Sequence, residues 1–178
     1  MAAPEPNRVV PERSARELAD YKAKIASELR VHVYYIPGRE FIVAPLDGNR
    51  GLFVEVRDVT KLPEDVDNEL LGRIICNNLL WNVPEVPRDL RDRKMTDWPA
   101  YIASGFKSVR QFQTKSIYID IHTINTVLSI EARPLADYVA ADIFLGSQLP
   151  LGPDHDLIGE RIRKLLRGLS LLQKADFY

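Results

Sequence analysis

Strictly alternating apolar residues in one segment constrain the fold of this chain more than any other feature of the sequence. Between Lys115 and His122 every second residue is isoleucine, at positions 117, 119 and 121. Successive side chains of a β-strand point to opposite faces of a sheet, so this segment predicts a strand whose isoleucines face a core. Asn125 is a suitable turn residue, and Val127–Glu131 then predicts the partner strand of a hairpin.

Similar segments, rich in β-branched and aromatic residues, recur elsewhere in the chain. The further predicted strands cover 31–36, 41–44, 52–56 and 138–145. Pro37-Gly38 joins the first two as a hairpin, and a cluster of strand breakers from Pro45 to Gly51 separates the second from the third. The strands therefore fall into two groups of sequence neighbours.

Two helices are predicted around the first group of strands. From Ser14 to Leu29, apolar residues recur every three or four positions, as in an amphipathic helix. Pro63 precedes three acids that suit the positive end of a helix dipole, and the apolar period continues to Trp81. These acids are Glu64, Asp65 and Asp67. The prolines and charges between Asn82 and Pro99 predict a long surface connection.

The second half adds a short helix after Ser108 and a long final helix that Asp154 or Asp156 can cap. An apolar stripe predicts that the final helix packs on the sheet: Leu157, Ile158, Ile162, Leu165, Leu166, Leu169 and Leu172. Its cations are expected to face water: Arg161, Arg163, Lys164 and Arg167. Hairpins flanked by helices predict an α+β fold, a mainly antiparallel sheet covered by amphipathic helices on one side.

The chain has 178 residues, 46% of them hydrophobic, which suffices for one substantial core. We therefore expect a single α+β domain over 13–178, preceded by a flexible, proline-rich lead-in over 1–12. The formal net charge of −1 gives no overall field that would gather nucleic acid or an anionic membrane. A single cysteine, together with no apolar signal core and no membrane-spanning run, favours a cytoplasmic protein.

Few patterns in the sequence favour catalysis. Asp120 and His122 share one face of a predicted strand, as a metal site or an acid–base pair requires, but no further ligand lies at a convincing spacing. We interpret them as charges on a solvated sheet face. His155-Asp156 resembles the His-Asp pair of metal phosphohydrolases, but the chain's 3 histidines do not supply the rest of such a site. Cys76 lies in an apolar helical stretch, where a buried thiol is commoner than a nucleophile.

The sequence lacks the local signatures of serine-elbow hydrolases, dinucleotide binding, P-loops and zinc ribbons. We therefore expect no catalytic residue, no metal site and no cofactor. The acids that follow Pro63 suit a helix start, and they also form a negative patch that could engage a basic protein partner.

Short motifs between residue 98 and residue 134, and in the last helix, carry a family resemblance. They are Trp98, Gly105-Phe106-Lys107-Ser108, Phe112, Ile130-Glu131-Ala132-Arg133-Pro134 and Ile158-Gly159-Glu160. In these motifs the chain resembles the immunity proteins of contact-dependent growth inhibition (CDI), the CdiI family. The resemblance implies a small cytoplasmic bacterial protein that binds and neutralises a toxin domain delivered by a neighbouring cell. Toxins of such systems are often nucleases, commonly acting on tRNA.

The resemblance further implies that the partner is the C-terminal domain of the cognate CDI toxin, without direct contact to nucleic acid or membrane. Carboxylates presented to a basic cleft would give electrostatic complementarity. The residues expected to bind the toxin are Glu64, Asp65, Asp67, Tyr118, Asp120 and His122. Two alternatives stay open: a small metal-dependent hydrolase that uses Asp120 and His122, with Asp154 or His155, and an oligomeric scaffold.

Overall fold

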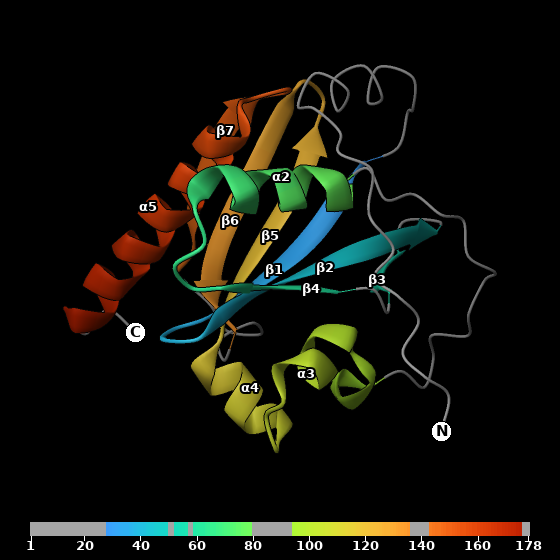
Figure 1. Cartoon of the computed structure of the whole chain (residues 1–178), viewed down its shortest axis with the longest axis vertical. Helices are drawn as coiled ribbons and strands as arrows, with labels where there is room; N and C mark the ends of the chain where they lie inside the picture. The colour runs from blue at the N-terminus through green and yellow to red at the C-terminus, as the bar shows by residue number, and fades with distance from the viewer. Residues whose placement is uncertain (1–27, 50–51, 57–58, 80–93, 136–142, 176–178) are drawn as a thin grey trace.

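The computed structural model describes residues 28–49, 52–56, 59–79, 94–135 and 143–175. They form one domain around a 7-stranded sheet of order β3-β2-β1-β5-β6-β7, in which β4 also pairs with β2 (Figure 1). The strands are β1 (Arg30–Ile36), β2 (Glu40–Asn49), β3 (Leu52–Glu55), β4 (Thr60–Pro63), β5 (Ile117–Ile124), β6 (Val127–Pro134) and β7 (Leu145–Pro150). All neighbouring strands are antiparallel, which confirms the predicted α+β class.

Helices pack on both faces of this sheet. They are α2 (Asn68–Leu79), the 3-10 helix η1 (Met95–Asp97), α3 (Pro99–Ser104), α4 (Val109–Lys115) and α5 (His155–Lys174). Residues of α2 and α5 share one apolar cluster with the sheet, and residues of α3 and α4 share a second one. The prediction of helices on one side only is therefore wrong, because the sheet has a second buried face.

The first core lies between the sheet and helices α2 and α5. Val31 and Val33 of β1 and Ile119 and Ile121 of β5 are 0% exposed in it. Cys76 of α2 is buried in the same cluster. The alternating isoleucines thus face a core, as their spacing predicted.

The second core lies between the opposite face and helices α3 and α4. Tyr34 of β1 and Phe112 of α4 are 0% exposed in it, with their rings 5.1 Å apart. Trp98, a motif residue, packs against this cluster, and Gly105 ends α3 in the left-handed conformation at φ 68°. Ser108 begins α4 as predicted, with its hydroxyl accepting a hydrogen bond from the Gln111 amide.

Helices α2 and α5 cross at two glycines. A Cβ on Gly72 would stand 1.9 Å from the His155 carbonyl oxygen, and a Cβ on Gly159 would stand 2.3 Å from the Asn68 carbonyl oxygen. No side chain fits at either distance, so backbone packs directly on backbone. The first turns of the two helices are therefore held side by side.

Two prolines act differently from their predicted roles. β2 continues through Pro45 instead of ending there. Pro45 lies opposite Val31 of β1, between the segment that pairs with β4 and the segment that pairs with β3. Neither the β2–β4 pairing nor the β2–β3 pairing includes Pro45, so neither one requires the N–H that proline lacks. Pro63 closes β4, a strand that the sequence did not predict, and α2 begins only at Asn68.

Several predicted segments fall partly outside the described residues. The lead-in over 1–12 does, and so does the first predicted helix, of which Glu28 and Leu29 are described and are not helical. Of the predicted strand at 138–145, only the last three residues are described, and β7 begins at the last of them. The connection before Pro99 is described from Lys94 onward, where it contains η1. Among the described helices, none has the length and apolar character needed to cross a bilayer.

Candidate functional site

Polar side chains gather on the second face of the sheet, where β1 and β5 run side by side. Residues opposite each other in these strands include His32 with Asp120, Tyr34 with Tyr118, and Arg30 with His122. Each pair lies on the face opposite the valines and isoleucines of the first core, because side chains alternate along a strand. This register brings ionisable groups from sequence positions 90 residues apart into one cluster.

An ion pair joins Arg30 and Asp120 in this cluster. Arg30 Nε donates to Asp120 Oδ1 at 2.8 Å, and Arg30 Nη2 donates to Oδ2. The hydrogen bond to Asp120 raises the pKa of the Arg30 guanidinium, and the nearby negative charge adds to this, although partial burial opposes it. One cation thus engages both carboxylate oxygens of Asp120. The alternative metal-dependent hydrolase would need these same oxygens to bind its metal.

Tyr118, Asp120 and His122 are not on the surface. They are 3%, 4% and 8% exposed. His122 Nδ1 lies 3.7 Å from Asp120 Oδ2, beyond hydrogen-bond distance, and no described residue hydrogen-bonds to it. The prediction that Asp120 and His122 lie on a solvated face is therefore wrong, since alternation identifies a face but not what covers it.

Glu55 of β3 is a buried member of the cluster that the sequence analysis missed. It is 5% exposed; its Oε1 accepts from the Tyr34 hydroxyl at 2.5 Å, and its Oε2 accepts from the Ala100 amide at 3.1 Å. His32 Nδ1 lies 3.4 Å from Oε1. One carboxylate therefore ties β3 and α3 to the central strand. The signal for it was an acid between two valines, Val54 and Val56, in a predicted strand.

Aromatic rings fill the space between these charges. The Tyr118 ring lies 4.9 Å from the His32 ring and 5.6 Å from the Tyr34 ring. The Arg133 guanidinium stacks over Tyr118 at 5.3 Å. Tyr118 therefore packs inside the second core and does not offer an open contact surface.

The three predicted acids lie elsewhere, in the loop between β4 and α2. Glu64 accepts a hydrogen bond from the Tyr35 hydroxyl, which is the main reason that the pKa of its carboxyl is lowered; the Gly38 backbone amide also contributes. Asp67 Oδ1 accepts from the Leu70 amide at 2.6 Å and so caps α2, while Asp65 is exposed. Contrary to prediction, all three precede the first turn of α2.

The structure therefore does not bring the six predicted toxin-binding residues into one site. Tyr35, which holds Glu64, packs against the first core, whereas Tyr118 belongs to the second. The acids of the loop and the Asp120 cluster thus lie on opposite faces of the sheet. Each group has to be considered as a separate candidate.

The cations of α5 follow the prediction only in part. Arg163 does not face water freely: its Nε donates to Asn68 Oδ1 at 2.9 Å, and its Nη1 donates to the Glu64 carbonyl oxygen at 3.2 Å. Its Nη2 donates to the Val66 carbonyl oxygen. Arg163 therefore fixes the acidic loop against α5. Lys164 and Arg167 are exposed, as expected.

Nucleophile and metal chemistry gain no support from the described residues. Burial raises the pKa of the Cys76 thiol to about 12, which keeps it protonated at neutral pH. No group of three or more histidine, cysteine, aspartate or glutamate side chains in the described ranges could hold a metal ion. The ionisable groups on the second face of the sheet contact one another, as Arg30 does with Asp120 and Tyr34 with Glu55.

No protein-family model and no curated protein matches the chain. Among solved structures, it is similar to a protein of unknown function from Neisseria meningitidis, at 21% identity and a TM-score of 0.55, over 75% of this chain and 90% of that one. It is also similar to a chain of the CdiA-CT/CdiI toxin and immunity complex from Yersinia pseudotuberculosis. That match has 17% identity and a TM-score of 0.54, over 80% of this chain and 98% of the other. At these identities the likeness establishes a shared fold.

Proposed function

We propose that this chain is a non-enzymatic immunity protein, which binds the C-terminal toxin domain of a CDI system and neutralises it inside the cell. The observation that carries the proposal is the shared fold with a chain of a toxin and immunity complex, over 98% of that chain. The motif resemblance in the second half of this chain points the same way.

The internal contacts of the polar cluster are consistent with a binding protein. A general base has to reach a substrate, and a metal ligand has to reach a metal ion. Asp120 is instead engaged by Arg30, and Glu55 by Tyr34 and Ala100. These groups position strands and helices. We assign Tyr118, Asp120 and His122 to that supporting role, beneath whatever surface meets the toxin.

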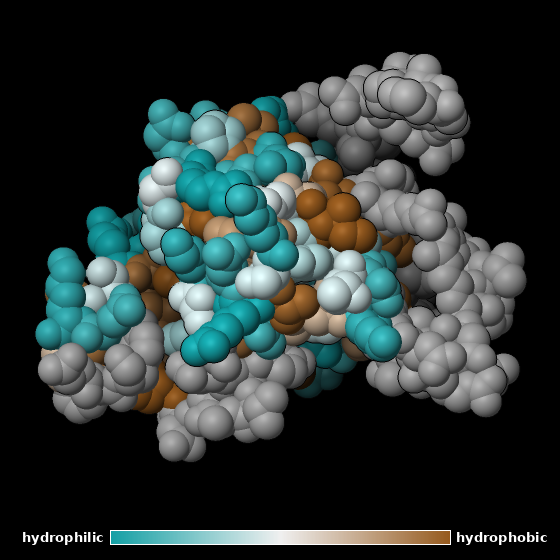
Figure 2. All heavy atoms as spheres, turned by 90° about the horizontal axis from the view of Figure 1, so that it is seen from below, coloured by the Kyte–Doolittle hydropathy of each residue, from teal (hydrophilic) through white to brown (hydrophobic). Residues whose placement is uncertain are grey.

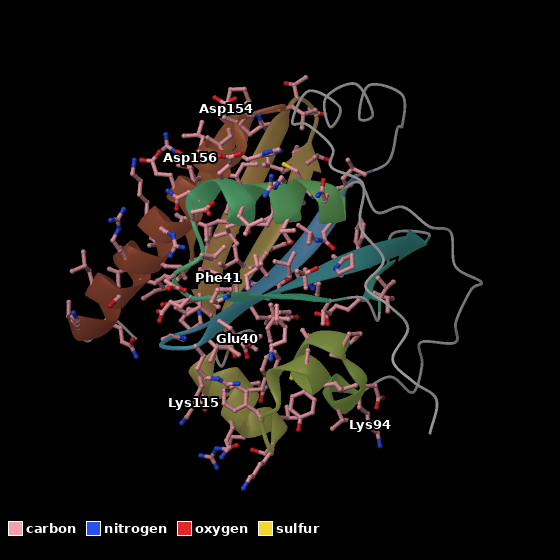
Figure 3. The ribbon with its side chains drawn as sticks, in the orientation of Figure 1. Glu40, Phe41, Lys94, Lys115, Asp154 and Asp156 are labelled. Carbon is pink, nitrogen blue, oxygen red and sulfur yellow. The ribbon has the colours of Figure 1, made fainter. Side chains whose placement is uncertain are left out.

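The exposed acids provide the better contact surface for a nuclease toxin, including one that acts on tRNA. Asp65 and Asp67 precede α2 and are exposed. Asp154 and Asp156 lie at the start of α5 and are also exposed (Figure 3). The glycine crossing holds the first turns of these two helices together. A cleft that binds a phosphate backbone is basic, and carboxylates on one side of a partner complement it.

The test begins with the gene directly upstream, which the proposal expects to encode a large secreted protein with a variable C-terminal domain. Producing that domain in a bacterial host should stop growth, and co-expressing this chain should restore growth. The two purified proteins should elute together as a stoichiometric complex. Growth arrest that this chain does not relieve, with no complex on the column, would show that the immunity function is wrong.

A further inference from the structure

A pocket of about 480 Å³ opens at the end of the molecule that carries α4. Its walls are mainly apolar and come from Ile36, Pro37, Phe106, Ile117 and Pro134. Seen from this end, apolar side chains lie between hydrophilic ones on the surface (Figure 2). The volume is within the range of roughly 300 to 1,000 Å³ that is usual for small-molecule sites.

Ser116 lines this pocket, and its buried hydroxyl group has no partner among the described residues. Ser116, which follows α4, is 4% exposed, and no described residue hydrogen-bonds to its Oγ. Burying a hydroxyl group is unfavourable unless it is hydrogen-bonded. The Oγ atom is inaccessible in this structure, so a ligand oxygen in the pocket would provide the missing hydrogen bond once the Ser116 side chain rotates toward it.

Two cations line the same pocket. Arg39 is held in place by its Nη2, which donates to the Ser104 carbonyl oxygen at 2.9 Å, and by the Phe106 ring, 5.0 Å from its guanidinium. Lys115 ends α4 and is exposed; in Figure 3 it lies below Glu40 of β2. Glu40 is shared between Arg39, at 3.1 Å, and Lys61, at 2.8 Å, so one carboxylate serves two cations. The charges around the pocket thus favour an anion.

We propose that this pocket binds a small organic carboxylate with an aliphatic or aromatic body. The body would pack on the apolar walls, and the carboxylate would pair with Lys115 and Arg39 and accept a hydrogen bond from Ser116 Oγ. The same chemistry occurs in a free carboxylic acid and in the terminal carboxyl group of a peptide. This site is separate from the acids proposed to meet a toxin, and it does not depend on that function.

The binding test uses ¹⁵N-labelled full-length protein and two-dimensional amide NMR spectra. The probes are 4-phenylbutyrate as a free acid, acetyl-glycyl-phenylalanine as a peptide carboxylate, and 4-phenylbutyramide as the uncharged control. We expect saturable shifts at Phe106 and Ser116 with at least one acid and weaker binding of the amide. If 4-phenylbutyrate binds more tightly, the ligand is a free carboxylic acid; if acetyl-glycyl-phenylalanine binds more tightly, it is the terminal carboxyl group of a peptide. Without saturable shifts up to roughly 10 mM, or with equal affinity for the amide, the assignment is overturned.

Matched variants separate the site from nonspecific attraction. Lys115→Gln should weaken binding roughly two- to fivefold, whereas Lys174→Gln, at an exposed lysine of α5 that does not line the pocket, should leave it unchanged. Ser116→Ala should raise the urea midpoint of the free protein, because an unpaired buried hydroxyl is removed, and should weaken binding by roughly threefold. Equal effects of the two lysine variants, or unchanged binding by Ser116→Ala, would contradict the proposed site.

Discussion

Arg30 and Asp120 carry opposite charges in the sheet, and losing one of them should cost more than losing both. Arg30→Met would leave the Asp120 carboxylate, 4% exposed, without its cation. We expect the free energy of unfolding to fall by roughly 3 kcal/mol, and the double variant Arg30→Met with Asp120→Leu to recover part of it. Urea unfolding at pH 7 measures both. Arg110→Met, at an exposed arginine of α4, should change stability by no more than roughly 0.5 kcal/mol.

Tyr35 and Glu64 should make part of the stability depend on pH. The hydrogen bond from Tyr35 lowers the pKa of the Glu64 carboxyl below its ordinary value of 4.5 in the folded state. Its contribution is therefore present above that value and is lost as pH falls through the lower, folded-state pKa. The stability difference between the original protein and Tyr35→Phe should be constant from pH 6 to pH 8 and should shrink in acid.

The control for this experiment is Tyr101→Phe, because Tyr101 lies on α3, in the other core. Its effect on the free energy of unfolding should not follow the same acid transition. A Tyr35→Phe difference that stays constant from pH 8 down to pH 3 would show that Glu64 does not depend on this hydrogen bond.

At the residue scale, the sequence predicted which side chains share a face but not their environment. Ile119 and Ile121 were assigned correctly to a core, because every second residue of the strand is apolar. Asp120 and His122 alternate with the isoleucines along the strand, and for that reason they were predicted to face solvent. The cation that pairs with Asp120 is Arg30, which is distant in sequence, so no local pattern could have revealed this ion pair.

At the scale of elements, the crossing of α2 and α5 depends on two glycines. Gly72→Ala or Gly159→Ala would place a Cβ 1.9 or 2.3 Å from a backbone carbonyl oxygen of the partner helix. Backbone cannot move aside as a flexible side chain can, so each variant should lose roughly 2–3 kcal/mol of stability. Differential scanning calorimetry would show the loss as a lower melting temperature.

Gly168 provides the matched control in α5. A Cβ there would meet the end of the Leu145 side chain at 2.6 Å, which can rotate away. Gly168→Ala should therefore be close to neutral, or stabilise the helix by up to roughly 1 kcal/mol. If Gly72→Ala and Gly168→Ala have the same effect, close backbone packing is not what the first glycine provides.

Element boundaries show why local signals were sufficient for some segments and not for others. The turn at Asn125, with φ 52°, and the cap at Ser108 were predicted because each acts on its immediate neighbours. The part of β2 from Pro45 onward and the whole of β4 were not predicted, because Pro45 and Pro63 break structure only where their missing N–H is needed. That depends on which strand lies alongside, and the sequence alone does not specify it.

At the scale of the whole molecule, a net charge of −1 means that any attraction to a basic toxin has to be local. Asp65→Asn and Gln111→Lys each raise the net charge from −1 to 0, but only the first removes an acid beside the start of α2. Asp65→Asn should slow association with the toxin domain roughly two- to threefold at low salt, and the difference should disappear at high salt. Surface plasmon resonance measures both rates, and Gln111→Lys should match the original protein.

Neighbouring residues of β1 belong to different cores: Val33 packs beneath α2 and α5, and Tyr34 packs against α4. The two compartments therefore share a wall that is one strand thick. A substitution that shifts β1 to relieve crowding on one side must disturb the packing on the other. Pairs of substitutions that are each tolerated alone should then combine non-additively across the sheet, so that this protein's evolution on one face is constrained by what has already changed on the reverse.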